Sequence, residues 1–248
     1  MKITFHSINI KNKGVMIIQY FGGKAKIAKY IVPFLESHRK ENQTYVEPFV
    51  GGANIVSKMT GKRYAYDLNE YLIEMYKGVQ DGYQLPDTLS EEQYQYIKNH
   101  KDEDKVLTGF VGFGCSFAGK WFGGYARDNN GRNYCKNAKN SIIKQFPYIK
   151  DVIFECKDYK ILNPHDCLIY CDPPYQGTTK YTGVPDFNSN EFWDIMRRWA
   201  IDNDVYISEY NAPTDFESVL TILTKTDIRD TNNKDIKRIE KLFTYVIE

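Results

Sequence analysis

A short apolar run that stops at an acid and two prolines constrains the fold of this sequence most. Residues 167–171 read Cys-Leu-Ile-Tyr-Cys, and Asp172, Pro173, Pro174 and Tyr175 follow directly. An uninterrupted apolar run of this length is typical of a strand buried on both faces. Proline has no N–H to donate to a neighbouring strand, so the strand must end there. The sequence therefore predicts a buried strand that brings a carboxylate, backbone carbonyls and an aromatic ring to one edge of a sheet.

The residues after this strand have the chemistry of a pocket for a planar amino group. The amine nitrogen of adenine or cytosine is a poor nucleophile, because its lone pair is delocalised into the ring. Asp172 and the carbonyl of Pro173 can accept its N–H bonds and free the lone pair for attack on a sulfonium methyl group, and Tyr175 can stack on the ring. This chemistry requires no metal. The alternative is a plain strand-to-loop turn, and four residues alone do not decide between the two.

Strands and helices alternate along most of the chain. The helix expected near the C-terminal third carries Phe192, Ile195, Met196 and Trp199, whose spacing places one apolar stripe on one helical face. Such alternation predicts an α/β fold with a mostly parallel, Rossmann-like sheet and helices on both faces. The expected strands lie at 45–48, 64–66, 152–154, 168–170, 205–207 and 242–247, and further helices lie near 53–59 and 72–76.

Residues 78–150 break this rhythm and form an expected insert. The segment is polar and glycine-rich from Gly109 to Gly124, and we predict a mainly helical subdomain between two halves, 1–77 and 151–248, of the main domain. The net charge of the whole chain is only +1, but charge is segregated within the insert. Residues 81–104 hold seven acids and two lysines, whereas residues 115–150 hold seven basic residues and one acid. This asymmetry predicts a local phosphate-binding face, although a solvated surface with segregated charges remains an alternative.

A glycine turn and a following acid predict a nucleoside site. Residues 49–53 read Phe-Val-Gly-Gly-Ala after the first expected strand, and Asp67 ends the second one. A glycine turn lets a ligand approach the backbone, and an acid at that place can accept hydrogen bonds from both ribose hydroxyls. The alternative is that Asp67 only caps a helix starting near Asn69. We expect Ala53 to have helical dihedral angles, because Gly52 can absorb the turn.

Several classes of protein are excluded or disfavoured. Residues 114–120 match the first seven positions of a P-loop, but Trp121 stands where Ser or Thr must hold magnesium, and no apolar strand precedes them. Five cysteines without a CxxC pair indicate reduced thiols rather than a disulfide framework. The sequence lacks a run of about 18 apolar residues and residues 1–14 lack the apolar core of a signal peptide. We therefore expect a soluble protein of the cytoplasm that does not bind a membrane.

Three segments together resemble a known family. They are residues 20–24 (Tyr-Phe-Gly-Gly-Lys), residues 46–51 (Val-Glu-Pro-Phe-Val-Gly) and residues 172–175 (Asp-Pro-Pro-Tyr). In this order they resemble the D12 class of N6-adenine DNA methyltransferases, the alpha-ordered group that includes GATC-methylating enzymes. Residues 112–127 and 207–213 are similar to segments of phage-borne members. The resemblance begins near Tyr20, and residues 1–15 match nothing in it.

The resemblance implies a Rossmann-like, S-adenosylmethionine-dependent methyltransferase sheet with a target-recognition insert. Asp172, Pro173, Pro174 and Tyr175 would hold a flipped adenine, and Lys24 would lie near the methionyl end of the cofactor. The implied cofactor contacts are Tyr20, Lys24, Phe49, Gly51, Asp67 for the ribose, Asp158 near the adenine, and Asp172. The implied DNA contacts in the insert are Lys120, Trp121, Tyr125 and Arg127.

The expected activity is methyl transfer from S-adenosylmethionine to N6 of adenine in double-stranded DNA, with base flipping. We expect no metal, a monomer or weak dimer, and a place in a restriction–modification system or a phage-infected bacterial cell. Methylation of RNA or of a protein glutamine amide would need a similar pocket and stays an alternative. A catalytically silent DNA-binding relative is a further alternative, which Asp172, Tyr175, Asp67 and Lys24 speak against.

Overall fold

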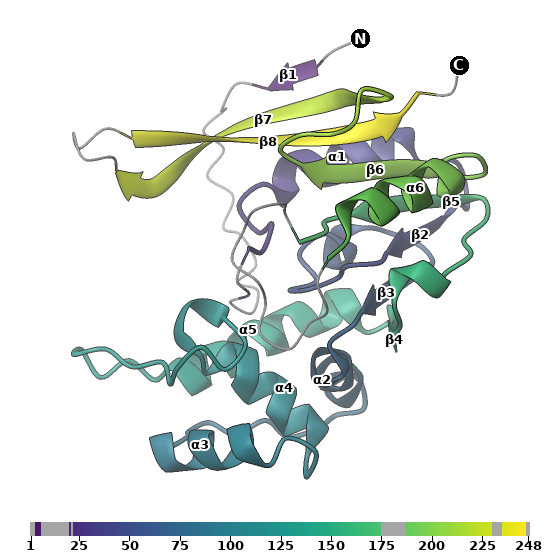
Figure 1. The fold of residues 1–248 in the computed structure, drawn as a ribbon. Helices are drawn as coiled ribbons and strands as arrows, with labels where there is room; N and C mark the ends of the chain where they lie inside the picture. The colour runs from purple at the N-terminus through teal and green to yellow at the C-terminus, as the bar shows by residue number, and fades with distance from the viewer. Residues whose placement is uncertain (1–2, 6–19, 21, 175–186, 230–234, 247–248) are drawn as a thin grey trace.

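One mixed sheet organises the chain (Figure 1). The computed structural model describes residues 3–5, 20, 22–174, 187–229 and 235–246. Within these residues eight strands form a single sheet in the order β1-β7-β8-β6-β5-β2-β3-β4. The strands are β1 (Ile3–Phe5), β2 (Thr44–Glu47), β3 (Arg63–Asp67), β4 (Ile153–Cys156), β5 (Cys167–Cys171), β6 (Asp204–Glu209), β7 (Phe216–Arg229) and β8 (Asp235–Tyr245).

Five consecutive strands, β6-β5-β2-β3-β4, are parallel, which confirms the expected Rossmann-like sheet. β2 pairs with β3 on one side and with β5 on the other, and β4 and β6 extend the sheet outward. The chain runs from β2 to β3 and β4, and then crosses back to β5 and β6. The order therefore reverses between β2 and β5, and ligands of such sheets bind beyond the carboxyl ends of the strands at this point. β8 is antiparallel to β6 and β7.

Helices cover both faces of the sheet, as expected. Alternate residues of β5 enter different apolar clusters: Leu168 and Tyr170 pack with α1, α2 and α5, whereas Ile169 packs with α6. This alternation follows from the two-residue period of a strand. The helices are α1 (Ala28–His38), α2 (Glu70–Gln80), α3 (Glu91–Asn99), α4 (Lys105–Gly114), α5 (Tyr134–Ile149) and α6 (Ser189–Trp199).

Helices α3, α4 and α5 make residues 78–150 mainly helical, and Figure 1 shows α3 and α4 beyond α2, away from the sheet. Helix α4 lies so close to α2 that a side chain at Gly109 would overlap the carbonyl of Tyr71. The largest apolar cluster runs without interruption from Tyr45 in the sheet to Phe110 and Ile142 in the insert. The insert and the sheet thus share one core, and the boundary between them remains a prediction.

The structure differs from the expectations in four elements. The helix expected near residues 53–59 is wrong: a turn leads into the short 3₁₀ helix Val56–Lys58. β7 was not expected, and β8 begins before the predicted strand at residue 242. α1 was not expected either; it contains Pro33, which lacks an N–H and so hides a helix from sequence patterns.

Two further sequence questions are answered by the elements. Gly114 ends helix α4, so no strand precedes the P-loop-like residues and a P-loop is excluded. Asn69 caps α2, with its side chain accepting the N–H of Leu72, so Asp67 is not the cap of that helix. No helix in the described ranges combines the length and the apolar character that a membrane crossing requires.

Candidate functional site

The site residues come from the carboxyl ends of three neighbouring strands. β2 ends at Glu47, β3 ends at Asp67, and Asp172 follows the end of β5. β2 lies between the other two, at the point where the strand order reverses. The topology therefore brings the predicted glycine turn, the predicted ribose acid and the predicted catalytic acid to one edge of the sheet.

The glycine turn is held by hydrogen bonds to both the N–H and the carbonyl of Gly51. Asp67 Oδ2 accepts the N–H of Gly51 at 3.1 Å, and Asp67 Oδ1 accepts the N–H of Asn69 at 2.9 Å. The hydroxyl of Tyr76 donates to the Gly51 carbonyl at 2.8 Å. Gly51 has a φ of +44°, a left-handed conformation that glycine adopts without strain. The expected pairing of this turn with Asp67 is thus present as direct contact.

Ala53 does not have the helical dihedral angles that we expected from the sequence. Its φ is +52°, and its methyl group is fully buried. Gly52 therefore does not absorb the turn, and the left-handed residues are Gly51 and Ala53. An L-residue in this conformation costs about 1–2 kcal/mol. The turn is consequently strained at Ala53 and must be held by its surroundings.

Tyr20 lies directly on the glycine turn. A side-chain carbon at Gly51 would come within 2.8 Å of the Tyr20 ring, and one at Gly52 within 2.9 Å of Tyr20 Cβ. The ring also packs against Phe113 of α4, with 5.0 Å between centroids. The first and second motifs of the sequence therefore form one surface, which requires glycine at both turn positions.

Lys24 is paired with the predicted catalytic acid. Its Nζ lies 2.8 Å from Asp172 Oδ1 and 3.5 Å from Glu240 Oε1, and the lysine is buried. Burial alone would lower the pKa of Lys24, but the charges of Asp172 and Glu240 together raise it above its usual value. The ammonium group bonds to both carboxylates, and its contact with the methionyl end of the cofactor stays a prediction.

Two acids that the sequence interpretation left without a role complete this edge. Glu240, on β8, accepts a hydrogen bond from Ser208 at 2.8 Å in addition to its contact with Lys24. Glu47 is buried and accepts the hydroxyl of Tyr45 at 2.9 Å. Burial raises the pKa of Glu47 well above its ordinary value, and the charge of Asp172 adds to this. Glu47 precedes Pro48 as Asp172 precedes Pro173, and that shared pattern could have identified it.

Phe49 and Asp158 lie toward the other face of the turn. Phe49 packs on Tyr159 with 5.0 Å between ring centroids, and both contact the ring of Phe187. Asp158 begins the 3₁₀ helix Tyr159–Ile161 and accepts the N–H of Lys160 at 3.0 Å. The sequence neighbour of Asp158 therefore touches Phe49, which brings both predicted cofactor contacts to one aromatic cluster.

The predicted adenine pocket is only partly within the described residues. Pro173 is buried and Pro174 is half-buried next to Asp172. Tyr175 lies outside the described residues, so its expected stacking role stays a prediction.

The four predicted DNA contacts in the insert divide into two pairs. Lys120 and Arg127 are exposed, and Arg127 pairs with Glu91 at 2.6 Å. Trp121 packs against Tyr71, with 5.5 Å between ring centroids, and is half-buried. Tyr125 is half-buried too, and its hydroxyl donates to the Leu89 carbonyl at 2.6 Å. The two aromatic side chains are half-buried, whereas Lys120 and Arg127 are exposed, so the two basic residues are the stronger predictions for phosphate contact.

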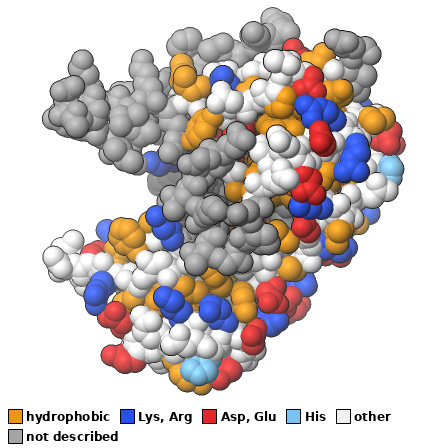
Figure 2. All heavy atoms as spheres, in the orientation of Figure 1, with side chains coloured by type: hydrophobic (Ala, Val, Ile, Leu, Met, Phe, Trp, Pro, Cys, Tyr) orange, Lys and Arg blue, Asp and Glu red, His pale blue; other side chains and the backbone are white. Residues whose placement is uncertain are grey.

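Basic side chains of the insert lie among acids rather than in one continuous patch. Lys139 pairs with Asp87 at 3.0 Å, and Arg132 lies 3.7 Å from Asp128. Figure 2 shows Lys and Arg side chains mixed with Asp and Glu over the lower part of the molecule. The basic residues that are segregated from acids along the sequence are therefore partly neutralised by acids that lie close to them in the structure.

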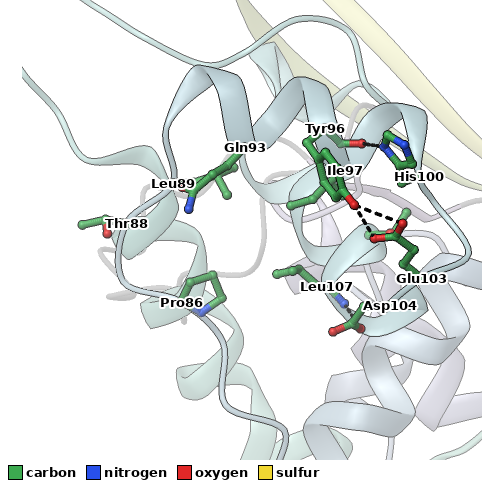
Figure 3. A pocket seen from close by; sticks show the side chains of 11 residues that line it. Pro86, Thr88, Leu89, Gln93, Tyr96, Ile97, His100, Glu103, Asp104 and Leu107 are labelled. Carbon is green, nitrogen blue, oxygen red and sulfur yellow. Dashed lines mark hydrogen bonds between the residues drawn. The ribbon is translucent and has the colours of Figure 1, made fainter.

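A cavity of about 310 Å³ lies within the insert, away from the strand ends. Its walls come from α3, α4 and the segment before α3, and include Leu89, Ile97 and Leu107 (Figure 3). The hydroxyl of Tyr96 at its rim donates to Glu103. None of the predicted site residues lines this cavity, so it is separate from the site at the sheet edge.

Comparison with known proteins identifies the family. A family model described as D12 class N6 adenine-specific DNA methyltransferase matches residues 20–109 and 122–238. The chain belongs to this family. The D12-class match spans the first glycine element, the glycine turn and the Asp-Pro-Pro segment, which confirms the resemblance drawn from the sequence.

One curated relative of this D12-class chain is Modification methylase StsI from Streptococcus sanguinis. It is 26% identical over 241 residues, and the alignment covers 79% of this chain and 36% of StsI. The chain thus spans about a third of the length of this curated relative.

Solved structures are similar only at a distance. PH1948 from Pyrococcus horikoshii, described as a candidate RNA methyltransferase, has a TM-score of 0.43 at 10% identity, over 96% of this chain and 91% of its own. The candidate methyltransferase yhhF from Escherichia coli has a TM-score of 0.37 at 6% identity, over 93% of this chain and 91% of its own.

Proposed function

We propose that this chain transfers a methyl group from S-adenosylmethionine to N6 of adenine in double-stranded DNA. The observation that supports this most is the position of Asp172 and Pro173. They follow the strand that neighbours β2, so an amine acceptor site and a nucleoside turn share one edge of the sheet. Membership of the D12 class supports adenine as the acceptor base.

The residues at the turn fit the cofactor. Both carboxylate oxygens of Asp67 are already oriented by backbone N–H groups, and each has a second lone pair that can accept a ribose hydroxyl. The Tyr20 ring on Gly51 offers an aromatic surface beside that acid. Phe49 and Asp158 would border the adenine. When bound, S-adenosylmethionine supplies the methyl group as an electrophilic sulfonium.

Asp172 and the carbonyl of Pro173 would accept the two N6–H bonds. An ionised carboxylate has about four acceptor sites, so the bond from Lys24 leaves Asp172 the capacity to accept the amine. Lys24 holds that carboxylate in one orientation. Among the described residues, the carboxyl groups of Asp172 and Glu240 both contact the ammonium group of Lys24, and a negative balance of charge suits a sulfonium cation.

Residues 78–150 would provide DNA recognition. Exposed Lys120 and Arg127 are our candidates for phosphate contact, which would position the duplex without reading its sequence. Extruding the adenine costs a few kcal/mol, and stacking on Tyr175 would offset part of this.

The test is methyl transfer by Asp172→Ala. With tritiated S-adenosylmethionine and mixed-sequence double-stranded DNA, we expect incorporation into adenine to fall at least about a hundredfold, because the acceptor for N6–H is lost. Asp194→Ala is a matched control, since Asp194 is exposed on α6 and pairs only with Arg197 among the ion pairs described for it. Undiminished transfer by Asp172→Ala would refute the assignment.

The same assay separates the alternatives. Wild-type protein that labels RNA or protein glutamine, but not DNA, would transfer the methyl group to another planar amine. Wild-type protein that binds DNA but labels nothing would be a silent relative.

A further inference from the structure

Helix α5 of the insert reaches back to the glycine turn through one side chain. Gln145 is fully buried, and its Nε2 lies 3.1 Å from the Gly52 carbonyl and 3.3 Å from the Ala53 carbonyl. These two residues follow Gly51, whose N–H is held by Asp67. One amide group of the insert thus donates to two consecutive carbonyls of the turn that forms the nucleoside site.

The turn needs such a donor because of its conformation. Ala53 is held at a φ of +52°, where an L-residue is strained, and it is followed by a 3₁₀ helix rather than an α-helix. A buried carbonyl without a donor also destabilises the fold by more than a hydrogen bond to that carbonyl would stabilise it. Gln145 therefore gives the buried carbonyls a donor and holds the turn at Ala53, the strained residue.

Gln145 is a costly residue to bury for stability alone. Its Oε1 has no hydrogen-bond partner within the part of the chain that the structure describes. A buried amide with only one of its two polar ends hydrogen-bonded stabilises the fold less than an apolar side chain of the same size would. Such an amide is therefore expected where its donor has a role that an apolar side chain cannot fill. This points to a role in placing the turn rather than in filling the core.

We propose that Gln145 is a positioning residue for the cofactor turn, through which the insert sets the affinity for S-adenosylmethionine. This rests on the proposed function. Exposed Lys136 and Lys144 lie on the same helix as Gln145, so contacts of the insert with DNA and the shape of the cofactor site share one rigid element. Any coupling carried by this helix is reciprocal: DNA and cofactor change each other's affinity by the same factor.

The test replaces Gln145 by methionine, which keeps the length and removes the donor. We expect the Kd for S-adenosylmethionine, measured by isothermal titration calorimetry, to rise about tenfold. KM for the cofactor should rise similarly with kcat nearly unchanged, because Gln145 touches neither reacting group. If Gln145→Met does not fold, Gln145→Asn keeps the amide but shortens its reach, and the same rise in Kd is expected.

Gln80→Met is the matched control. Gln80 also donates through Nε2 to backbone carbonyls, those of Ile149 and Val152 at 2.8 Å each, but these carbonyls lie at and after the C-terminal end of α5 and not in the glycine turn. We expect this variant to lower the thermal midpoint and to leave the Kd for the cofactor unchanged.

The outcomes separate this inference from the function on which it rests. A wild-type Kd for Gln145→Met, or an equal loss of affinity in Gln80→Met, would show that Gln145 has only a structural role. Absence of cofactor binding by the wild-type protein would overturn the proposed function and this inference with it.

Discussion

At the scale of single residues, Asp67 shows how burial and hydrogen bonding compete. Burial raises the pKa of Asp67 above its usual value, although the N–H groups of Asn69 and Gly51 lower it. Burial wins, so the carboxyl takes up a proton at a higher pH than an exposed aspartate. Only the ionised form accepts hydrogen bonds from the backbone and from ribose hydroxyls at both oxygens.

Cofactor affinity should therefore weaken on acidification. We expect the Kd for S-adenosylmethionine to be constant above the raised pKa of Asp67 and to increase as the pH falls through it, because the protonated free protein then has to release a proton in order to bind the cofactor. In Asp67→Asn we expect at least about tenfold weaker binding near pH 8. This variant should lack the increase of the Kd at acid pH, the acid limb of the profile. Calorimetric titrations from pH 8 to pH 5 measure both, and an unchanged acid limb in Asp67→Asn would assign it to another group.

Sequence reasoning reached the residues of local motifs and missed those that arrive from a distance. Asp67 and Gly51 could be paired because strand, turn and acid have a fixed spacing. The partners of Lys24 could not be inferred, because Glu240 reaches it from an antiparallel strand whose position depends on the whole sheet. Gln145 gave no signal, since a lone glutamine in a helix is ordinarily a surface residue.

At the scale of elements, the contact between α2 and α4 depends on glycine. A side chain at Gly109 would overlap the Tyr71 carbonyl, which belongs to the α2 backbone. At Gly78 an added carbon would instead meet the side chain of Val106, at 2.6 Å. The Tyr71 carbonyl can move away only if helix α2 moves, whereas the clash with Val106 can be relieved by a substitution that shortens its side chain.

Gly109→Ala should accordingly cost at least about 3 kcal/mol in the free energy of unfolding. Gly78→Ala should cost about 1 kcal/mol, and Val106→Ala should remove most of that cost in the double variant. Urea unfolding of the four variants and the wild type measures this cycle. An equal cost for Gly78→Ala with and without Val106 would show that the two sites do not interact.

The elements themselves were predictable where the apolar period was clear. β5 and α6 were expected at nearly their observed positions, because a five-residue apolar run and an i, i+3, i+4, i+7 stripe allow few alternatives. The segment after Gly51 was not, because its buried residues are fixed by the strained turn at Ala53 rather than by helical spacing. Tertiary packing there overrides local preference.

At the scale of the whole molecule, the near-neutral net charge does not show that exposed lysines lie on two different surfaces. Lys136 and Lys144 are exposed on α5, which contacts the carboxyl edge of the sheet through Gln145. Lys40 and Lys62 are exposed at the opposite, amino edge, just before β2 and β3. The four lysines contribute equally to net charge, so they separate local phosphate contact from general attraction.

Replacing Lys136 and Lys144 by glutamine should weaken DNA binding and make it less sensitive to salt. If both lysines contact phosphates, the slope of log K against log salt should become shallower by about 1.8, or 0.9 for each contact. The Lys40→Gln and Lys62→Gln pair should leave that slope unchanged. Fluorescence anisotropy with duplex DNA at several salt concentrations gives both slopes, and equal slopes for the two pairs would place the DNA elsewhere.

The ion-pair group around Lys24 can be completed only late in the synthesis of the chain. Lys24, Asp172 and Glu240 come from an early segment, a central strand and a late strand of the chain. No continuous fragment that stops before residue 240 can complete the group. During synthesis, the predicted catalytic acid Asp172 therefore shares Lys24 with Glu240 only after residue 240 of β8 has left the ribosome.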